Sequence, residues 1–237
     1  MAFCRTTIHV VQPGDTFYRL AQRYQTTVPE IIMKNPGINP YNLQVGTRLT
    51  ICSGQGNNTA MQDEVQLNND MRKSWLQHIF WARMLMTSLF ENLEDMDAVE
   101  AKTMRIPEDI AEVFVRFYPK AQMEQLTRLL AEHTDLTSQM MSAMKSEDMQ
   151  RMDQMERLWY QNAEKLAALL SSMNRAYSYE DLLQSFGKHL DMLKRQMSAA
   201  LDGNHEEEIR IFEENENQLM ELADYLTEGL LQQFYRS

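Results

Sequence analysis

Hydrophobic and polar residues at the front of the chain form short segments separated by turns. β-Branched residues come first, and a turn at Pro13-Gly14 leads into apolar residues at helical spacing. A capping box, Thr27-Val28-Pro29-Glu30, begins a second helix, which ends at Asn35-Pro36-Gly37. The predicted elements are a strand at 8–11, a helix from 17 to 24, a helix from 27 to 35 and a strand at 48–51.

Helical periodicity runs through residues 70–235, and the chain has no proline after residue 120. Leu, Met, Glu, Gln, Lys and Arg dominate there, which is the composition of long helices. Breaks in the pattern predict about five or six helices, with loops short enough to make neighbours antiparallel. The breaks fall near Met96-Asp97, Tyr118-Pro119, Lys145-Asp148, Asn174-Tyr179 and Asp202-His205.

Glycine and proline separate these two parts of the chain. Five of the eight glycines and four of the six prolines lie in the first 56 residues. Residues 53–59 offer almost nothing to bury, which is typical of a flexible connector. We therefore predict a small α+β domain of βααβ type at 1–52, a flexible linker at 53–69 and an all-α helical bundle at 70–237.

Composition and charge narrow the classes of function. With 43% hydrophobic residues among 237, the chain can bury a core and is not expected to be disordered throughout. The formal net charge of -11 argues against nucleic acid as a partner. No apolar run approaches the ~20 residues of a membrane helix, and the first residues lack the apolar stretch of a secretion signal. We therefore expect a protein made in the cytoplasm, with no signal peptide and no membrane span.

Four motifs in the front segment carry a family resemblance: Val10-Val11-Gln12-Pro13-Gly14-Asp15-Thr16, Leu20-Ala21, Asn35-Pro36-Gly37-Ile38 and Leu43-Gln44-Val45-Gly46-Thr47-Arg48-Leu49. Together they resemble a LysM domain over roughly residues 7–52. The resemblance implies a non-catalytic module that binds N-acetylglucosamine-containing glycan, either peptidoglycan or a chitin-type oligosaccharide. The ligand would lie in a shallow groove between the loop after the first strand and the loop before the second.

The resemblance also implies which residues line the groove. Exposed loop amides beside small apolar groups suit an acetamido group, which offers a donor, an acceptor and a methyl. The same residues have structural uses, because they turn the chain and cap or stop a helix. By position, the groove residues are Gly14, Asp15, Thr16 and Phe17 on one side and Gly37, Ile38, Asn39 and Pro40 on the other.

The two cysteines, Cys4 and Cys52, flank this segment. If the strands pair antiparallel, as in the family, the start of the first lies beside the end of the second, so the two sulfurs could form a disulfide. That bond would stabilise the domain by roughly 4 kcal/mol in the chain-entropy model. Two reduced thiols in a cytosolic protein are the alternative.

Three histidines accompany a weak internal repeat in the helical part. His133 and His189 match at an offset of 56 residues, and His78 precedes His133 by 55. We expect the three at comparable levels of one bundle, where histidines and carboxylates of facing helices can bind metal. Glu132 and Asp191 are the candidate carboxylates. Glu132 is adjacent to His133, however, and adjacent side chains on a helix project about 100° apart, so these two are poorly placed to bind the same ion. We favour histidines that are hydrogen-bonded within or near the core, with no metal or other cofactor.

The helical part carries a second resemblance, through Trp75/His78/Trp81/Arg83, Leu129-Leu130-Ala131-Glu132-His133, Trp159/Asn162/Ala163, His189-Leu190, Ala223-Asp224-Tyr225-Leu226 and Gln232-Gln233-Phe234. With these residues it is similar to an uncharacterised helical-bundle family of spore-forming bacteria. The similarity covers most of residues 72–235 and implies no particular activity.

The motifs of common enzyme classes do not occur in the sequence. It has no phosphate-binding loop, nucleophile elbow or zinc-protease helix, so we do not expect an enzyme. We predict a glycan-binding module that anchors a helical domain at the cell wall or spore envelope, where that domain binds a protein partner or itself. One alternative is a metal-binding or wall-modifying enzyme with its activity in the bundle. Another is a cytosolic protein whose front module makes protein contacts.

Overall fold

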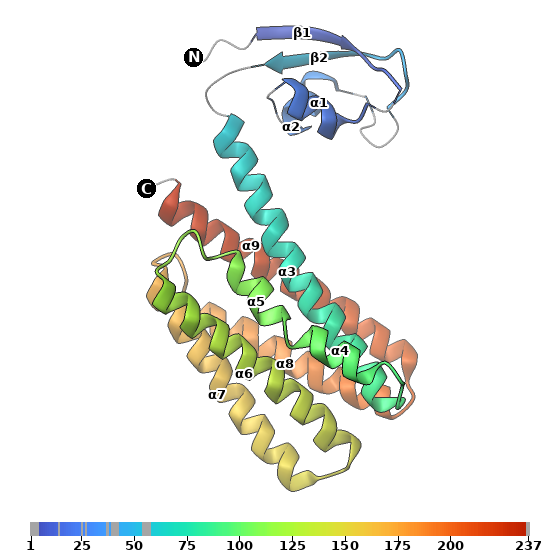
Figure 1. The fold of residues 1–237 in the computed structure, drawn as a ribbon, viewed down its shortest axis with the longest axis vertical. Helices are drawn as coiled ribbons and strands as arrows, with labels where there is room; N and C mark the ends of the chain where they lie inside the picture. The colour runs from blue at the N-terminus through green and yellow to red at the C-terminus, as the bar shows by residue number, and fades with distance from the viewer. Residues whose placement is uncertain are drawn as a thin grey trace. The chain divides into compact units, whose positions relative to one another are not determined.

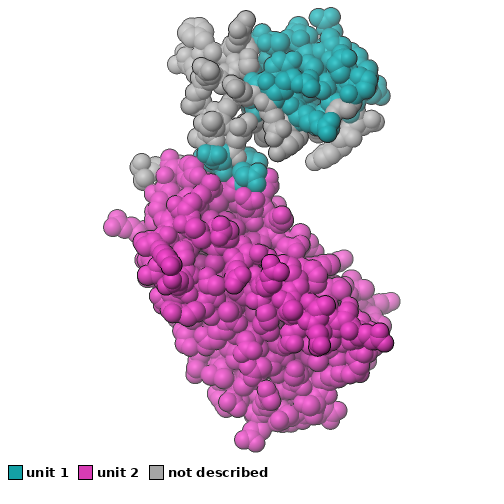
Figure 2. Space-filling model, in the orientation of Figure 1, with its two compact units in different colours: residues 1–66 teal, residues 67–237 magenta. Residues whose placement is uncertain are grey.

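The chain forms two compact units, residues 1–66 and 67–237, which Figure 2 colours separately. None of the described helices combines the length and apolar character that a membrane span requires. The structure is a computed structural model, and it describes residues 5–13, 15–24, 26, 28–36, 38, 43–53 and 58–235.

Unit 1 contains a two-stranded antiparallel sheet and two short helices (Figure 1). The strands pair so that Thr6 lies opposite Cys52 and Val10 lies opposite Arg48. Both helices contact the second strand and each other. The predicted βααβ order is therefore confirmed. The elements are β1 (Arg5–Val10), α1 (Phe17–Tyr24), α2 (Val28–Lys34) and β2 (Arg48–Ser53).

The core of unit 1 follows the two-residue period of its strands. His9 and Val11 are buried, whereas Ile8 and Val10, which alternate with them along the chain, are exposed. The buried strand positions meet the apolar face of α1, whose spacing the sequence revealed. The buried hydrophobic cluster consists of Val11, Phe17, Leu20, Ala21, Ile31, Leu49 and Ile51.

Unit 2 is all-α, as predicted. Consecutive helices α6, α7, α8 and α9 pack against one another, and α5 packs on α6. Figure 1 shows α3 beside α9, and the ion pair between Arg72 and Asp224 joins these two helices. The helices are α3 (Asn58–Phe90), α4 (Met96–Thr103), α5 (Ile106–Glu112), α6 (Lys120–Lys145), α7 (Met149–Met173), α8 (Tyr179–Leu201) and α9 (His205–Phe234).

The described part of the bundle has seven helices rather than five or six. The extra break lies between α4 and α5, where Pro107 is in the first turn of α5. Proline has no N–H and its ring clashes with the preceding helical turn, so a continuous helix through this position is strongly disfavoured. The first break also falls at residues 91–95 rather than at Met96-Asp97, which begin α4.

The predicted linker at 53–69 is too long. Helix α3 begins at Asn58, so residues 58–69 are helical. Leu67 is 1% exposed and belongs to the core of unit 2. Residues 58–69 contain no glycine or proline, the residues least favourable in a helix, so their sequence is compatible with the helix that forms. Residues 54–57 lie outside the described part of the chain.

Three helices of unit 2 end in the same way, with a residue in the left-handed region. These residues are Asn92 after α3, Glu147 after α6 and Gly203 after α8, with φ of 54°, 55° and 69°. In each case the next N–H donates to a carbonyl five residues back, which is the Schellman closure. The closing bonds are Leu93 to Ser88 at 2.9 Å, Asp148 to Ala143 at 3.0 Å and Asn204 to Ala199 at 2.9 Å.

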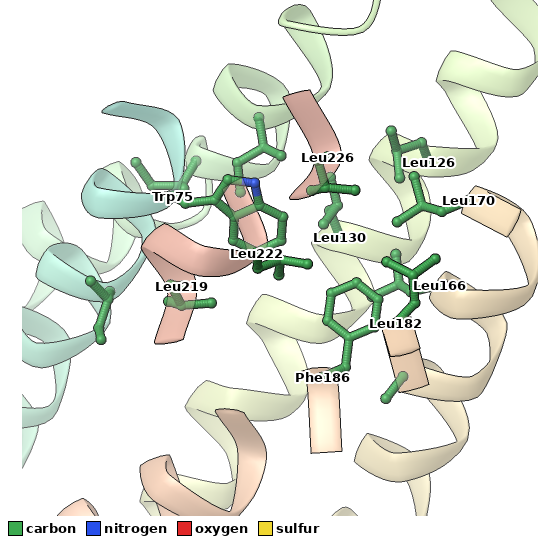
Figure 3. Close-up of a cluster of buried hydrophobic side chains, with 14 of the residues drawn as sticks. Trp75, Leu126, Leu130, Leu166, Leu170, Leu182, Phe186, Leu219, Leu222 and Leu226 are labelled. Atoms are coloured by element: carbon green, nitrogen blue, oxygen red, sulfur yellow. The ribbon is translucent and has the colours of Figure 1, made fainter. Parts of the chain in front are cut away.

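Large apolar side chains from facing helices meet in the interior of unit 2 (Figure 3). Trp75 of α3 and Leu222 of α9 lie on one side of the view, and Leu130, Leu166 and Phe186 come from α6, α7 and α8. Each of these five residues is at most 5% exposed. Burial of this kind stabilises by about 1.5–3 kcal/mol for each large side chain, so these contacts hold the helices in place.

Candidate functional site

The turn after β1 is organised by the carboxylate of Asp15. It accepts hydrogen bonds from the Gln12 backbone N–H at 2.8 Å and from His9 Nε2 at 2.7 Å, and it pairs with Arg23 at 3.3 Å. The bond from Gln12, helped by His9 and Arg23, holds the pKa of Asp15 below its usual range. The Asp15 side chain is only 4% exposed. Its carboxylate therefore stabilises the turn, and a sugar bound beside this turn would contact backbone groups instead of the carboxylate.

The next two residues fix the start of α1. Thr16 Oγ1 accepts from the Arg19 N–H at 3.1 Å, so Thr16 is the predicted N-cap, and it is exposed. Phe17 is 3% exposed and lies in the unit 1 core. Its ring holds α1 against the sheet.

The second predicted loop is held by Asn35, which is 7% exposed. Its Nδ2 donates to the carbonyls of Ile31 at 2.6 Å and Thr50 at 2.8 Å, and its Oδ1 accepts from the Thr50 N–H at 2.7 Å. This side chain ties the end of α2 to β2. We had predicted only that Asn35 ends a helix. Ile38, which is half-buried, packs against the unit 1 core.

The structure thus places four of the eight predicted groove residues. Two of them, Thr16 and Ile38, offer side chains at the surface, and the side chains of the other two, Asp15 and Phe17, are buried. The remaining groove residues lie outside the described part of the chain: Gly14, Gly37, Asn39 and Pro40.

Cys52 lies on β2 and is disulfide-bonded. Cys4, the only other cysteine of the sequence, lies outside the described residues. The pairing of Cys4 with Cys52 therefore stays a prediction.

Unit 2 brings its three interior histidines together, at the comparable level that the repeat predicted. His78, His133 and His189 come from α3, α6 and α8 and are 6%, 7% and 1% exposed. Their ring centroids are 5.4 to 5.7 Å apart. One ring nitrogen of each lies within 4.8 Å of the corresponding nitrogens of the other two.

Hydrogen bonds identify the tautomer of His189. Its Nδ1 lies 2.8 Å from Oδ1 of Asn215, a buried residue of α9. With the amide oxygen of Asn215 as the acceptor, Nδ1 carries the proton and Nε2 presents a lone pair. That lone pair faces His78 Nε2 at 3.3 Å. We had not predicted a role for Asn215, although it is a polar residue on the apolar face formed by Ile211, Leu219 and Leu222.

Burial keeps these imidazoles neutral. It lowers the pKa of His78 to about 3, assisted by His189, and lowers the pKa of His189 to about 4. It also lowers the pKa of His133 well below the usual value, with further effects from its two neighbours.

The histidines line a small cavity of about 10 Å³, which is about the space that one water molecule occupies. Its other walls are largely apolar and include Trp75, Leu130 and Phe186. The candidate carboxylates lie elsewhere: Glu132 pairs with Lys165 at 3.3 Å, and Asp191 accepts from the Tyr160 hydroxyl. Glu132 therefore does not join the histidines, as the 100° angle predicted.

Comparison with known proteins identifies the front unit. Residues 9–51 match the LysM domain family, which confirms the LysM resemblance. Unit 1 therefore contains a LysM domain, a non-catalytic module of the class that binds peptidoglycan and other N-acetylglucosamine-containing glycans. No curated protein and no solved structure matches the chain. The match ends at residue 51, so the resemblance of the bundle to a family of spore-forming bacteria stays a prediction.

Proposed function

We propose that the LysM domain binds an N-acetylglucosamine-containing glycan, peptidoglycan in the first place, and thereby anchors the helical bundle at a cell wall or spore envelope. The observation that carries this proposal is the family match over residues 9–51, on a segment with the βααβ order. Each predicted edge of the groove adjoins a segment that hydrogen bonds hold in place. One edge follows the turn held by Asp15, and the other follows Asn35, which joins the end of α2 to β2.

The chemistry of the described groove residues suits a neutral sugar. Thr16 is exposed, Ile38 offers apolar surface, and the one carboxylate, that of Asp15, is already engaged by Gln12, His9 and Arg23. A groove of this kind would bind an acetamido group through backbone amides and small apolar contacts. No unpaired charge would have to be desolvated when the glycan binds.

The bundle, in this proposal, is the part that the LysM domain delivers. It would bind a protein partner or a second copy of itself, and the protein would be assembled on the wall or spore surface after synthesis in the cytoplasm. Fractionation of sporulating cells, with detection of the intact chain in the envelope fraction, would test the location.

Co-sedimentation of the full-length protein with insoluble peptidoglycan, and separately with chitin, tests glycan binding. The informative variant is Thr16→Asp, because aspartate keeps the N-cap of α1 but adds a charge at the predicted groove. We expect at least about a tenfold loss of bound protein, since the added carboxylate must lose water against a neutral ligand.

Ile8→Asp is the matched control, because Ile8 is 55% exposed on the outer side of β1. It adds the same charge outside the predicted groove and should bind as the original protein does. Equal binding by all three proteins would show that Thr16 does not line the groove. If the original protein sediments with neither polymer, glycan binding itself is wrong, and a protein-contact role for the LysM domain replaces it.

A further inference from the structure

The buried histidine cluster of unit 2 has the composition and spacing of a metal site. We propose that His78, His133 and His189 bind one zinc ion between α3, α6 and α8. This site is separate from the LysM domain and does not depend on glycan binding.

The distance between two of the nitrogens supports zinc. Zn–N bonds of about 2.0–2.1 Å at a tetrahedral angle place two ligand nitrogens about 3.3 Å apart. His78 Nε2 and His189 Nε2 are 3.3 Å apart. The His133 nitrogen already lies within 4.8 Å of both, so a small shift of one ring completes a three-histidine set.

A purely structural cluster accounts less well for the same contacts. A hydrogen bond between His78 Nε2 and His189 Nε2 at 3.3 Å would satisfy one nitrogen on each of these two rings, but it gives no partner to His133. The interactions of the His133 ring with the described residues are ring contacts with His78, His189 and Trp159. A bound ion would give a ligand role to the nitrogens of all three rings.

Asn215 acts as the outer support that metal-binding histidines usually have. It accepts the Nδ1 proton of His189 at 2.8 Å, which fixes the tautomer and directs the Nε2 lone pair into the cluster. The sequence could not pair these residues, which lie on different helices.

The donor set selects the class of metal. Three neutral imidazoles without a carboxylate suit zinc and neighbouring late transition metals, whereas magnesium and calcium require oxygen ligands. Three histidines leave a fourth position open on zinc. The adjoining cavity of about 10 Å³ offers space there for a water-sized ligand.

Metal analysis of the full-length protein, without an affinity tag, tests the proposal. The protein would be unfolded with a chelator, refolded with zinc and dialysed before mass spectrometry of its metal content. We expect about one zinc per chain and, after refolding with cobalt instead, the visible absorption of a four-coordinate cobalt site. His133→Ala and His189→Ala should lose both signals, and circular dichroism would verify that each variant is helical.

His205→Ala is the matched control, because His205 is exposed at the start of α9 and lies outside the cluster. It should keep the metal. Asn215→Asp gives a second test that keeps all three ligands. A carboxylate beside His189 makes the imidazole a stronger ligand and offsets the charge of the ion, so zinc should bind about 10-fold more tightly. A structural cluster would only be destabilised by that buried carboxylate.

Folded original protein that retains no zinc would overturn the proposal, as would equal zinc content in His189→Ala and His205→Ala. If the histidine variants do not fold, the Asn215 variant decides. Tighter zinc binding supports the site, and unchanged or weaker binding refutes it.

Discussion

Gly187 in α8 and Gly229 in α9 should change the stability of the bundle in opposite directions when each is replaced by alanine. A Cβ added at Gly229 would lie 2.0 Å from Cε1 and 2.6 Å from Cδ1 of Tyr177. Tyr177 is 4% exposed, and its hydroxyl donates to the Leu226 carbonyl at 2.5 Å. A Cβ added at Gly187 would meet nothing within 4 Å. Gly229 is therefore required by a close contact, whereas Gly187 is not.

The expected changes in the free energy of unfolding follow from these contacts. Alanine gains about 1 kcal/mol over glycine within a helix at either position. At Gly229 the Tyr177 ring must retreat by more than 1 Å to reach ordinary contact, which begins at 3.4 Å. Such overpacking costs about 1–3 kcal/mol, and the Tyr177 hydrogen bond contributes about 1 kcal/mol more if it breaks. We expect Gly187→Ala to stabilise by up to about 1 kcal/mol and Gly229→Ala to destabilise by about 1–3 kcal/mol.

Urea unfolding followed by tryptophan fluorescence is the appropriate assay. All three tryptophans, Trp75, Trp81 and Trp159, lie in unit 2, so the signal reports on the bundle alone. The midpoint should rise for Gly187→Ala and fall for Gly229→Ala with an unchanged slope. Shifts of the same sign in both variants would refute the steric role of Tyr177.

Three further predictions concern other features of the fold. In metal-free protein, the free energy of unfolding should fall by about 2 kcal/mol per histidine between pH 7 and pH 5 for His78, His133 and His189. The unfolded histidines gain protons near pH 6.5, whereas the folded ones have a lowered pKa, so their stabilisation is present above pH 6.5 and lost as the pH falls. Urea midpoints that stay constant over this range would contradict the neutral cluster. Glu147→Gly should stabilise the bundle by about 0.5–1 kcal/mol, because residue 147 has a φ of 55°; a lower midpoint would show that the glutamate side chain compensates. Asn35→Ala should cost about 1–3 kcal/mol, because it removes the partner of the buried Ile31 carbonyl of α2 and of the partly buried backbone groups of Thr50 in β2. Amide exchange should then accelerate in unit 1, and unchanged exchange would rule out the proposed bridge.

Much of the fold could be predicted because it depends on local signals. The turn at Pro13-Gly14 and the cap at Thr16 determine where the first helix begins, and the structure confirms that cap. The breaks before Lys120, Met149 and His205 were also visible in the sequence. Two of the boundary differences also have local causes: Pro107 interrupts the helical pattern, and the segment 58–69 is polar but contains no helix breaker.

The sites were less predictable, because they depend on which faces of distant segments meet. The repeat indicated that the three bundle histidines share a level, but it could not show that His78 and His189, 111 residues apart, lie 3.3 Å from each other. Nor could it pair His189 with Asn215 or turn the Asp15 carboxylate inward to His9. Periodicity and capping act over a few residues and therefore determine elements. Side-chain packing between elements decides which polar groups are buried next to one another, and therefore where a binding site can form.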